Sequence, residues 1–327
     1  MKVFVYDYGQ SDEAEYFTRY TKEMGIELGY TEEDLRPDNC DLASGSDFIT
    51  ITPNKVTPDM IDRLKELGVK MICTRSIGYD HIDVEYAKKV GMIVTHITYN
   101  IEGVAEYTVM MMLMVVRRIK EMLQRTMAND FTMNGLLAKE LKDMSVGIIG
   151  AGKVGTSVLR DLSGFGCKLC YFNRTRNEEA ERYAERLELN DLLSRCDIIS
   201  LHLELNKDTF HFIDEEAFSK MKDGAILVNT ARGPLVDTDA LLESLRSNKI
   251  SGAALDVVEG EFNYYYHDCR DKDLEDHYIG ILRRMPNVVF THHMAFYYEG
   301  SIRDRVHNCL IGMKAYVDGK EMPYRLA

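Results

Sequence analysis

The chain has 327 residues, which is enough for two ordinary domains. Hydrophobic residues make up 45% of it and charged residues 28%, a balance that excludes a disordered or low-complexity chain. Lysines and arginines number 40 against 53 aspartates and glutamates, a net charge of −13 and the wrong sign for general binding to nucleic acid or to an anionic membrane. We therefore expect neither kind of partner.

The chain carries no sign of export or of membrane insertion. Its first residues, MKVFVYDYGQ, lack the apolar segment of a secretory signal, and the longest apolar run, residues 109–116, is too short to span a bilayer. The seven cysteines are odd in number and scattered, which is typical of reduced thiols in the cytoplasm. Cys167 and Cys170 form a C-x-x-C spacing, but in a strand their side chains face opposite sides, so we expect no metal.

The first hundred residues alternate short β-rich runs with helical patterns. Strands are expected at residues 2–6, 48–51, 69–73 and 92–95, and helices at residues 13–25, 58–67 and 84–90. Alternation of this kind is typical of an open parallel sheet covered by helices.

A long helix is expected next, at residues 102–124, and it is apolar over much of its length. Its four methionines, Met110, Met111, Met112 and Met114, suggest either a stripe that faces a cofactor or packing in the interior or at a subunit interface. We favour packing, because flexible methionines commonly fill such contacts.

A second alternating series follows. Strands are expected at residues 146–149, 168–172, 198–203, 225–229, 253–257 and 288–291, with a helix at residues 154–165. The last amphipathic stretch, residues 301–317, has no strand after it, which suits a chain that returns to cover the first domain.

The pattern predicts an α/β fold with two doubly wound parallel-sheet domains, Rossmann-like or flavodoxin-like, and a cleft between them. The cofactor domain, residues 100–298, is inserted into the substrate-binding domain, residues 1–99 plus 299–327.

A glycine-rich turn gives the strongest local signal. Gly150, Gly152 and Gly155 form a G-x-G-x-x-G pattern that directly follows a strand and opens a helix. The first glycine permits the tight turn, the second lets a pyrophosphate approach the backbone, and the third lets helix and strand pack closely. Free amides at the helix start, near Lys153 and Val154, would bind the phosphates of a dinucleotide.

The end of the next strand indicates which dinucleotide. A site for NAD commonly has Asp or Glu there for the ribose hydroxyls, whereas this chain has Asn173, followed by Arg174, Thr175 and Arg176. A carboxylate would repel the 2′-phosphate of NADP(H), whereas the guanidinium group of an arginine binds a phosphate through two hydrogen bonds. We expect NADP(H) to be preferred, with NAD(H) possible; the alternative is that the arginines only solvate the loop.

Three further segments each place a polar residue just past a strand, where open α/β sheets bind ligands. They are VNTARGPLVD with Arg232, AALDVVEGE with Asp256 and Glu261, and FTHHMAFY with His293. Reduction of a 2-keto acid needs a cation for the substrate carboxylate and a protonated group for the carbonyl oxygen, with a partner acid beside that group. Taken singly, each of these residues also has an ordinary structural explanation.

Long ordered motifs over essentially the whole chain make it resemble the D-isomer-specific 2-hydroxyacid dehydrogenases. The motifs are RSIGYDHID from Arg75, the Gly150–Gly155 turn, SLHL before NKDT, MKDGAILVNTARGPLVD, GAALDVVEGE and HMAFY from His293. Within the family, the chain is most similar to D-lactate dehydrogenases of the vancomycin-resistance type, and the NRTR segment resembles their NADPH-leaning version.

The resemblance implies a role for each matching position. Arg232 would bind the substrate carboxylate, His293 would be the general acid for reduction and the base for oxidation, and Glu261 would be its hydrogen-bonded partner. Other positions would bind substrate (Arg75, the amides of Ile77 and Gly78, Tyr99, Phe296) or cofactor (the Gly150–Gly155 turn, 173–176, His202, Leu203, the backbone of Thr230 and Ala231, Asp256). The family also implies a homodimer and direct hydride transfer without a metal.

Two positions depart from the family pattern. His292 stands where proline commonly precedes the catalytic histidine, and Glu204 stands where proline commonly follows the His-Leu pair. The register of the following Ala-Phe-Tyr favours His293 as the acid. Two other functions stay open: a reductase of larger 2-keto acids such as phenylpyruvate, 2-ketoisocaproate or hydroxypyruvate, and a non-enzymatic dinucleotide-sensing corepressor.

Overall fold

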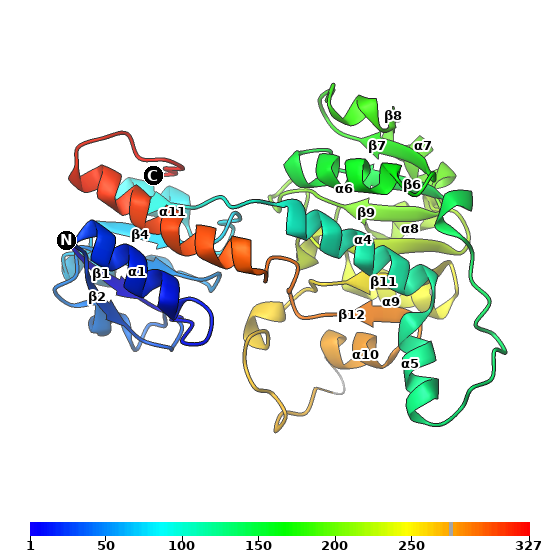
Figure 1. The fold of residues 1–327 in the computed structure, drawn as a ribbon, viewed down its shortest axis with the longest axis horizontal. Helices are drawn as coiled ribbons and strands as arrows, with labels where there is room; N and C mark the ends of the chain where they lie inside the picture. Colours follow the sequence, from blue (N-terminus) through cyan, green and yellow to red (C-terminus); the bar gives the residue numbers. More distant parts are fainter. Residues whose placement is uncertain (275–276) are drawn as a thin grey trace. The chain divides into compact units, whose positions relative to one another are not determined.

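The computed structural model describes residues 1–274 and 277–327 and divides into two compact units. One unit contains Met1–Asn100 and Tyr297–Ala327, and the other contains Ile101–Phe296 (Figure 1). Each unit is built on one parallel sheet, so the predicted α/β fold with two parallel-sheet domains is confirmed.

The first unit is a five-stranded parallel sheet with the order β2-β1-β3-β4-β5, which is the flavodoxin-like order. Its strands are β1 (Lys2–Val5), β2 (Glu27–Tyr30), β3 (Phe48–Ile51), β4 (Met71–Thr74) and β5 (Ile93–Thr95). Helices α1 (Ala14–Met24) and α11 (Glu299–Val317) cover one face, and α2 (Pro58–Glu66) and α3 (Val84–Val90) cover the other. Helix α11, at the end of the chain, therefore completes the core of the N-terminal unit.

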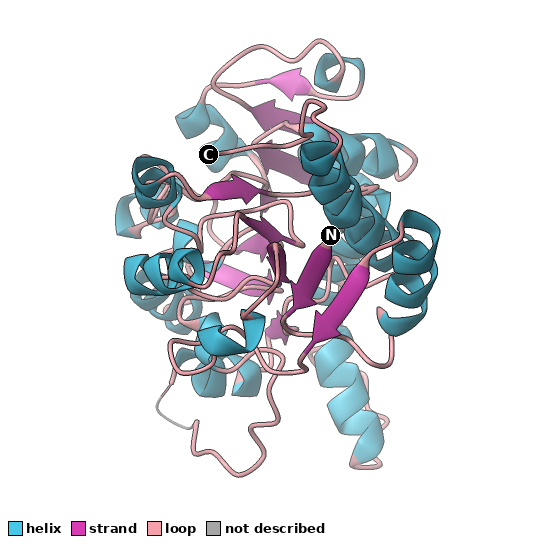
Figure 2. Cartoon of the chain, turned by 90° about the vertical axis from the view of Figure 1, so that its left-hand side faces the viewer, coloured by secondary structure: helices cyan, strands magenta, loops and turns pink. Residues whose placement is uncertain are grey.

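The second unit is a seven-stranded parallel sheet with the order β12-β11-β10-β9-β6-β7-β8, a Rossmann order with one further strand. Its strands are β6 (Ser145–Ile149), β7 (Lys168–Phe172), β8 (Glu185–Arg186), β9 (Ile198–Leu201), β10 (Ala225–Asn229), β11 (Ile250–Leu255) and β12 (Val288–Phe290). Its helices are α4 (Glu102–Val116), α5 (Ile119–Met127), α6 (Lys153–Ser163), α7 (Leu189–Arg195), α8 (Glu215–Lys220), α9 (Thr238–Arg246) and α10 (Tyr278–Arg284). Figure 2 colours these strands and helices separately.

Helices α4 and α6 cover one face of this sheet, and α7 to α10 cover the other. The central strands β6, β9, β10 and β11 are largely buried on both faces, as expected for a parallel sheet sandwiched by helices, whereas both residues of the edge strand β8 are exposed.

The single helix predicted over residues 102–124 is wrong, because the structure has two helices there. Arg118 has a φ of +53°, outside the right-handed helical region, and separates α4 from α5. The side chain of Lys120 donates to the carbonyls of Arg283, Met285 and Val288 at 2.6–2.8 Å, which ties the start of α5 to the end of α10. The chain therefore changes direction between α4 and α5 although neither glycine nor proline stands at the break.

The methionines of α4 divide between the core and the surface. Met111 and Met112 are fully buried, whereas Met110 and Met114 line an open apolar hollow of about 440 Å³ together with Phe165. Within the described residues, no helix is long and apolar enough to cross a bilayer, and no group of three or more histidine, cysteine or acidic side chains is placed to hold a metal ion.

Candidate active site

The glycine-rich turn joins β6 to α6, and its three glycines differ in their steric surroundings. Gly150 has a φ of +95°, and a Cβ added there would lie 2.5 Å from the carbonyl oxygen of His202. A Cβ on Gly155 would lie 2.2 Å from the carbonyl oxygen of Gly150, whereas one on Gly152 meets no atom within 4 Å. The first and third glycines are thus required by packing, and the second leaves open space beside the backbone.

The open space at Gly152 lies at the N-terminus of α6, an 11-residue helix that begins at Lys153. The first amides of an α-helix have no acceptor within the helix and carry a partial positive charge. Backbone amides, open space and a positive helix end together fit the pyrophosphate of a dinucleotide.

The four residues after β7 do not act as one cationic patch. The side-chain amide of Asn173 donates to the carbonyl of Thr175 at 2.9 Å, and Arg174 is exposed. Arg176 donates to both carboxylate oxygens of Glu181 at 2.7–3.0 Å, which neutralises its charge locally. Of the two arginines, Arg174 is therefore the better placed to meet a phosphate.

His202 and Leu203 follow β9 and lie beside the glycine-rich turn. The ring Nε2 of His202 is 2.9 Å from Ser200 Oγ, and Leu203 Cδ2 would lie 2.9 Å from a Cβ on Gly150. Burial lowers the pKa of His202 to about 4, so the ring is neutral near pH 7. His202 and Leu203 thus line one side of the glycine-rich turn with uncharged groups.

Arg232 follows β10 in a turn that Asn229 shapes. The Asn229 side chain donates to the Arg232 carbonyl at 2.8 Å and accepts from the Ala231 amide at 3.1 Å. Thr230 lies 2.8 Å, Oγ1 to Oγ1, from Thr108 on α4. The side chain of Arg232 is half-buried and donates to the Ala231 carbonyl at 2.7 Å. Asn229 was not predicted as a site residue, although the VNTARG segment places its amide side chain at a strand end.

His293 and Glu261 come from different strand ends and are in contact. His293 Nδ1 lies 2.7 Å from Glu261 Oε1, and the other carboxylate oxygen accepts from the Val258 amide at 2.7 Å. The Glu261 side chain is 5% exposed and that of His293 is 17% exposed. A buried carboxylate against one ring nitrogen fixes the orientation of the imidazole.

The segment that carries His293 is held by Asp256, which is buried at the end of β11. His293 has a φ of +60°, which is costly for a non-glycine residue, and its amide donates to the Asp256 carbonyl at 2.7 Å. The Asp256 carboxylate accepts from the Thr291 hydroxyl and from the amides of Met294 and Ala295 at 2.6–2.9 Å. The contact of Asp256 with a nicotinamide carboxamide stays a prediction; the observed contacts fix the loop.

Aromatic rings surround the imidazole of His293. The Tyr266 hydroxyl donates to the His293 carbonyl at 3.1 Å, and the Phe296 ring centre lies 6.0 Å from that of His293. His292 is exposed, with its ring 6.4 Å from that of Tyr265. The part that Tyr266 takes in holding the loop was not evident from the tyrosine-rich sequence.

In the first unit, the segment after β4 ends in a turn with two consecutive amides, those of Ile77 and Gly78. Neither amide has a hydrogen-bond acceptor among the residues that the structure describes. Paired amides at the carboxyl edge of a parallel sheet are a suitable grip for an anion. Tyr99 is half-buried and packs against the core under α1 and α11.

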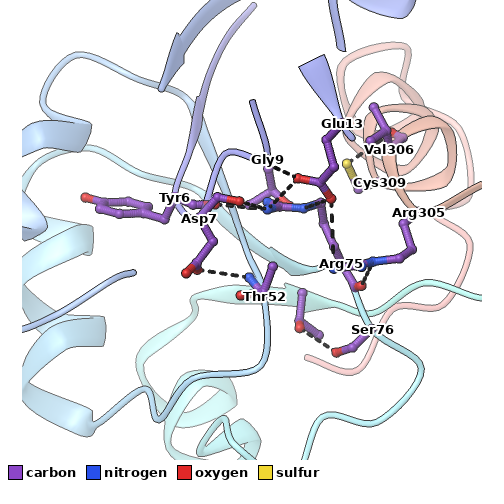
Figure 3. Close-up of polar contacts among 12 residues, drawn as sticks. Tyr6, Asp7, Gly9, Glu13, Thr52, Arg75, Ser76, Arg305, Val306 and Cys309 are labelled. Carbon is purple, nitrogen blue, oxygen red and sulfur yellow. Dashed lines mark hydrogen bonds and ion pairs between the residues drawn. The ribbon is translucent and has the colours of Figure 1, made fainter. Parts of the chain in front are cut away.

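The prediction that Arg75 binds substrate is wrong. Its side chain is 0% exposed and donates to both carboxylate oxygens of Glu13, to the carbonyls of Tyr6 and Asp7, and to the Thr50 hydroxyl (Figure 3). These acceptors occupy the guanidinium, so Arg75 holds the edge of the sheet together and does not reach a ligand.

Comparisons with known proteins show which family the chain belongs to. The profile of the D-isomer specific 2-hydroxyacid dehydrogenase NAD binding domain matches residues 109–295. The chain is 38% identical over 92% of its length to a D-specific alpha-keto acid dehydrogenase of Enterococcus faecium, of which the match covers 94%. It is 34% identical over 97% of its length to an aromatic 2-oxoacid reductase of Clostridium sporogenes, with 96% of that protein covered.

Among solved structures, the crystal structure of a D-lactate dehydrogenase of Treponema pallidum superposes with a TM-score of 0.87 at 30% identity, covering 99% of each chain. Fold and relatives together define the chain as a nicotinamide-dependent oxidoreductase. It belongs to the D-isomer-specific 2-hydroxyacid dehydrogenase family, and it is an NAD-dependent D-2-hydroxyacid dehydrogenase.

Proposed function

We propose that this enzyme reduces pyruvate to D-lactate reversibly, with His293 as the general acid for reduction and the general base for oxidation. The observation that carries the proposal is the hydrogen bond of 2.7 Å between His293 Nδ1 and the buried Glu261. A carboxylate in this position holds one nitrogen of the ring and leaves the other nitrogen for proton transfer to the substrate.

The remaining groups hold the substrate. Arg232 binds its carboxylate and polarises the keto group, and the amides of Ile77 and Gly78 bind the same carboxylate. NADH, when bound, supplies the hydride to C2, on the face that yields the R alcohol. His293 gives its proton to the keto oxygen, so C2 gains a hydride and the oxygen gains a proton.

The two units take separate parts in this proposal. Ile101–Phe296 is the dinucleotide-binding domain, and Met1–Asn100 with Tyr297–Ala327 is the substrate-binding domain. The seven free cysteines suit a cytoplasmic enzyme.

A turnover assay tests the proposal. The purified enzyme with pyruvate and NADH should give D-lactate at the rate of NADH oxidation, and His293→Gln should lower kcat by several powers of ten. Near-native turnover in His293→Gln would remove the histidine from the mechanism.

For the cofactor, we propose that NADPH is used in preference to NADH. Asn173 puts no negative charge near the ribose, and Arg174 is exposed and able to pair with a 2′-phosphate. Because Arg176 is paired with Glu181, Arg174 carries most of the preference. The test is the ratio of kcat/KM for the two cofactors in the native enzyme and in Arg174→Ala.

Reduction of an aromatic or otherwise larger 2-keto acid is a second candidate. The 34% identity to an aromatic 2-oxoacid reductase favours it, as do the aromatic rings at Tyr99 and Phe296. A panel of pyruvate, phenylpyruvate, 2-ketoisocaproate and hydroxypyruvate, compared by kcat/KM, separates the two candidates.

We also propose that the enzyme is a homodimer through α4, α5 and the segment after α5. This region exposes Leu123, Met127, Phe131, Met133 and Leu137, at 57–95% exposed. So many large apolar side chains in one segment are unfavourable in water unless they are covered. Phe131→Asp should shift the mass measured by light scattering to that of the monomer, while Leu42→Asp, at an exposed leucine of the other unit, should not.

A further inference from the structure

The turn after β4 is held in place through its carbonyl groups. The carbonyl of Arg75 accepts from Arg305 Nε at 2.7 Å, and that of Ser76 accepts from the Ile97 amide at 3.1 Å. The Gly78 carbonyl accepts from the Ser76 hydroxyl at 2.6 Å. The carbonyls on both sides of the turn are thus fixed, whereas the amides of Ile77 and Gly78 have no acceptor within the described residues.

Arg305 reaches this turn from α11, 230 residues further along the chain. It is 5% exposed, and its Nη2 lies 3.9 Å from Glu13 Oε1, the same carboxylate that pairs with Arg75 (Figure 3). Glu13 is also buried and accepts from the Gly9 amide at 3.4 Å. Two guanidiniums therefore share one carboxylate under the turn, and each donates further hydrogen bonds to backbone carbonyls.

A buried guanidinium is stable only when its charge is paired and its donors are satisfied. Such a group is rigid, because any shift breaks several bonds at once. Arg305 therefore holds the Arg75 carbonyl in place, and with it the peptide that leads into Ser76. Without that bond the Arg75 carbonyl loses the donor that holds it, although the Arg75 amide still donates to the Ile51 carbonyl and the turn is still attached through Ile97 and Ser76.

We propose that Arg305 is a positioning residue for binding of the substrate carboxylate. Its hydrogen bond to the Arg75 carbonyl fixes the turn whose Ile77 and Gly78 amides take the carboxylate. The inference rests on the proposed function and deepens it, because it assigns a part in substrate binding to a residue that does not touch the substrate. We therefore expect that loss of the Arg305 side chain weakens substrate binding and leaves the rate of the chemical step unchanged.

The experiment compares Arg305→Met and Arg305→Lys with the native enzyme. A hydrogen bond from a charged donor is worth roughly a factor of ten or more in an equilibrium constant, so the Met variant should raise KM for pyruvate about tenfold. Its kcat and its KM for NADH should change less than about twofold on the same reasoning. Arg305→Lys keeps the positive charge and the N–H donors of one nitrogen, so its KM for pyruvate should rise less than that of Arg305→Met.

Two further readouts separate positioning from general loss of structure. Arg305→Met should raise KM by the same factor for pyruvate and for phenylpyruvate, because the two substrates share only the 2-oxo acid group. Inhibition by oxamate should weaken by that factor as well. Arg303→Met is the matched control: Arg303 lies on the same helix but is exposed and paired with Asp304, and its replacement should leave KM unchanged.

An unchanged KM in folded Arg305→Met would overturn the proposal, as would a loss confined to kcat or to NADH. If the Met variant does not fold, the Lys variant decides: a raised KM with kcat kept supports the proposal, and a native KM overturns it. The proposed function fails separately, if the native enzyme reduces no 2-keto acid.

Discussion

Replacing Asp256 with asparagine tests whether this carboxylate holds the catalytic loop. Asparagine keeps the shape of the side chain but has one acceptor oxygen and an NH₂ group in place of two oxygens. If its oxygen keeps the bonds to Thr291 and Met294, the NH₂ group faces the amide of Ala295, which now lies 2.9 Å from the second oxygen.

The cost follows from these three bonds. One buried amide loses its acceptor, at about 1–3 kcal/mol, and two bonds to a charged acceptor become bonds to a neutral one, at about 1 kcal/mol each. The total is about 3–5 kcal/mol, acting on a segment that already holds His293 at a φ of +60°. A loss of about 3 kcal/mol from the active arrangement lowers kcat by about 100-fold.

The assay measures kcat, KM for NADH and the melting temperature for Asp256→Asn, with Asp197→Asn as the control. Asp197 also accepts several hydrogen bonds, from Ser145 and Lys222, but it precedes β9 and so lies at the opposite edge of the sheet. Both variants should melt at lower temperature, and only Asp256→Asn should lose kcat. A native kcat in Asp256→Asn, or a change in KM for NADH alone, would refute the reasoning.

Three other outcomes are expected. Glu261→Gln should lower kcat for reduction by about tenfold, because the His293 ring loses the charged acceptor that holds its orientation; a native kcat in this variant contradicts this. The pKa of His202 is lowered by burial from 6.5 to about 4, so the unfolded chain binds a proton that the folded chain does not, and stability is lost as pH falls from 6.5 toward 4. His202→Gln should remove up to about 3 kcal/mol of this acid sensitivity in urea unfolding at pH 4.5 and 7.5, and equal sensitivity in both proteins contradicts it. Asn173→Asp should lower the NADPH to NADH ratio of kcat/KM by about tenfold through repulsion of the 2′-phosphate, and an unchanged ratio contradicts the cofactor proposal.

Much of the fold was predictable because its strands are buried on both faces. Phe48–Ile51 and Ala225–Asn229 are mostly apolar and buried at every position, and their bounds follow directly from the sequence. Glu27–Tyr30 was missed, because ELGY is a half-exposed edge strand with a glycine and a charged residue. The break at Arg118 depends on a contact of Lys120 with α10, more than 160 residues away, so no local pattern marks it.

For the site, local motifs identified which segments matter but not which way the side chains point. Gly150 and Gly155 were predictable because each has a steric reason within a few residues. Arg75 was assigned wrongly, because its partner Glu13 lies 62 residues earlier and the motif alone does not reveal burial. Arg305 was missed for the same reason, since its hydrogen bond spans 230 residues.

The stereochemistry of the product shows whether the enzyme transfers a hydride to pyruvate to give D-lactate with His293 as the acid. The enzyme is incubated with pyruvate and NADH whose transferable hydrogen is deuterium, and the lactate is analysed by chiral chromatography and mass spectrometry. We expect D-lactate with one deuterium at C2, and almost none of it from His293→Gln. L-lactate, product without deuterium, or equal yield from the variant would contradict it.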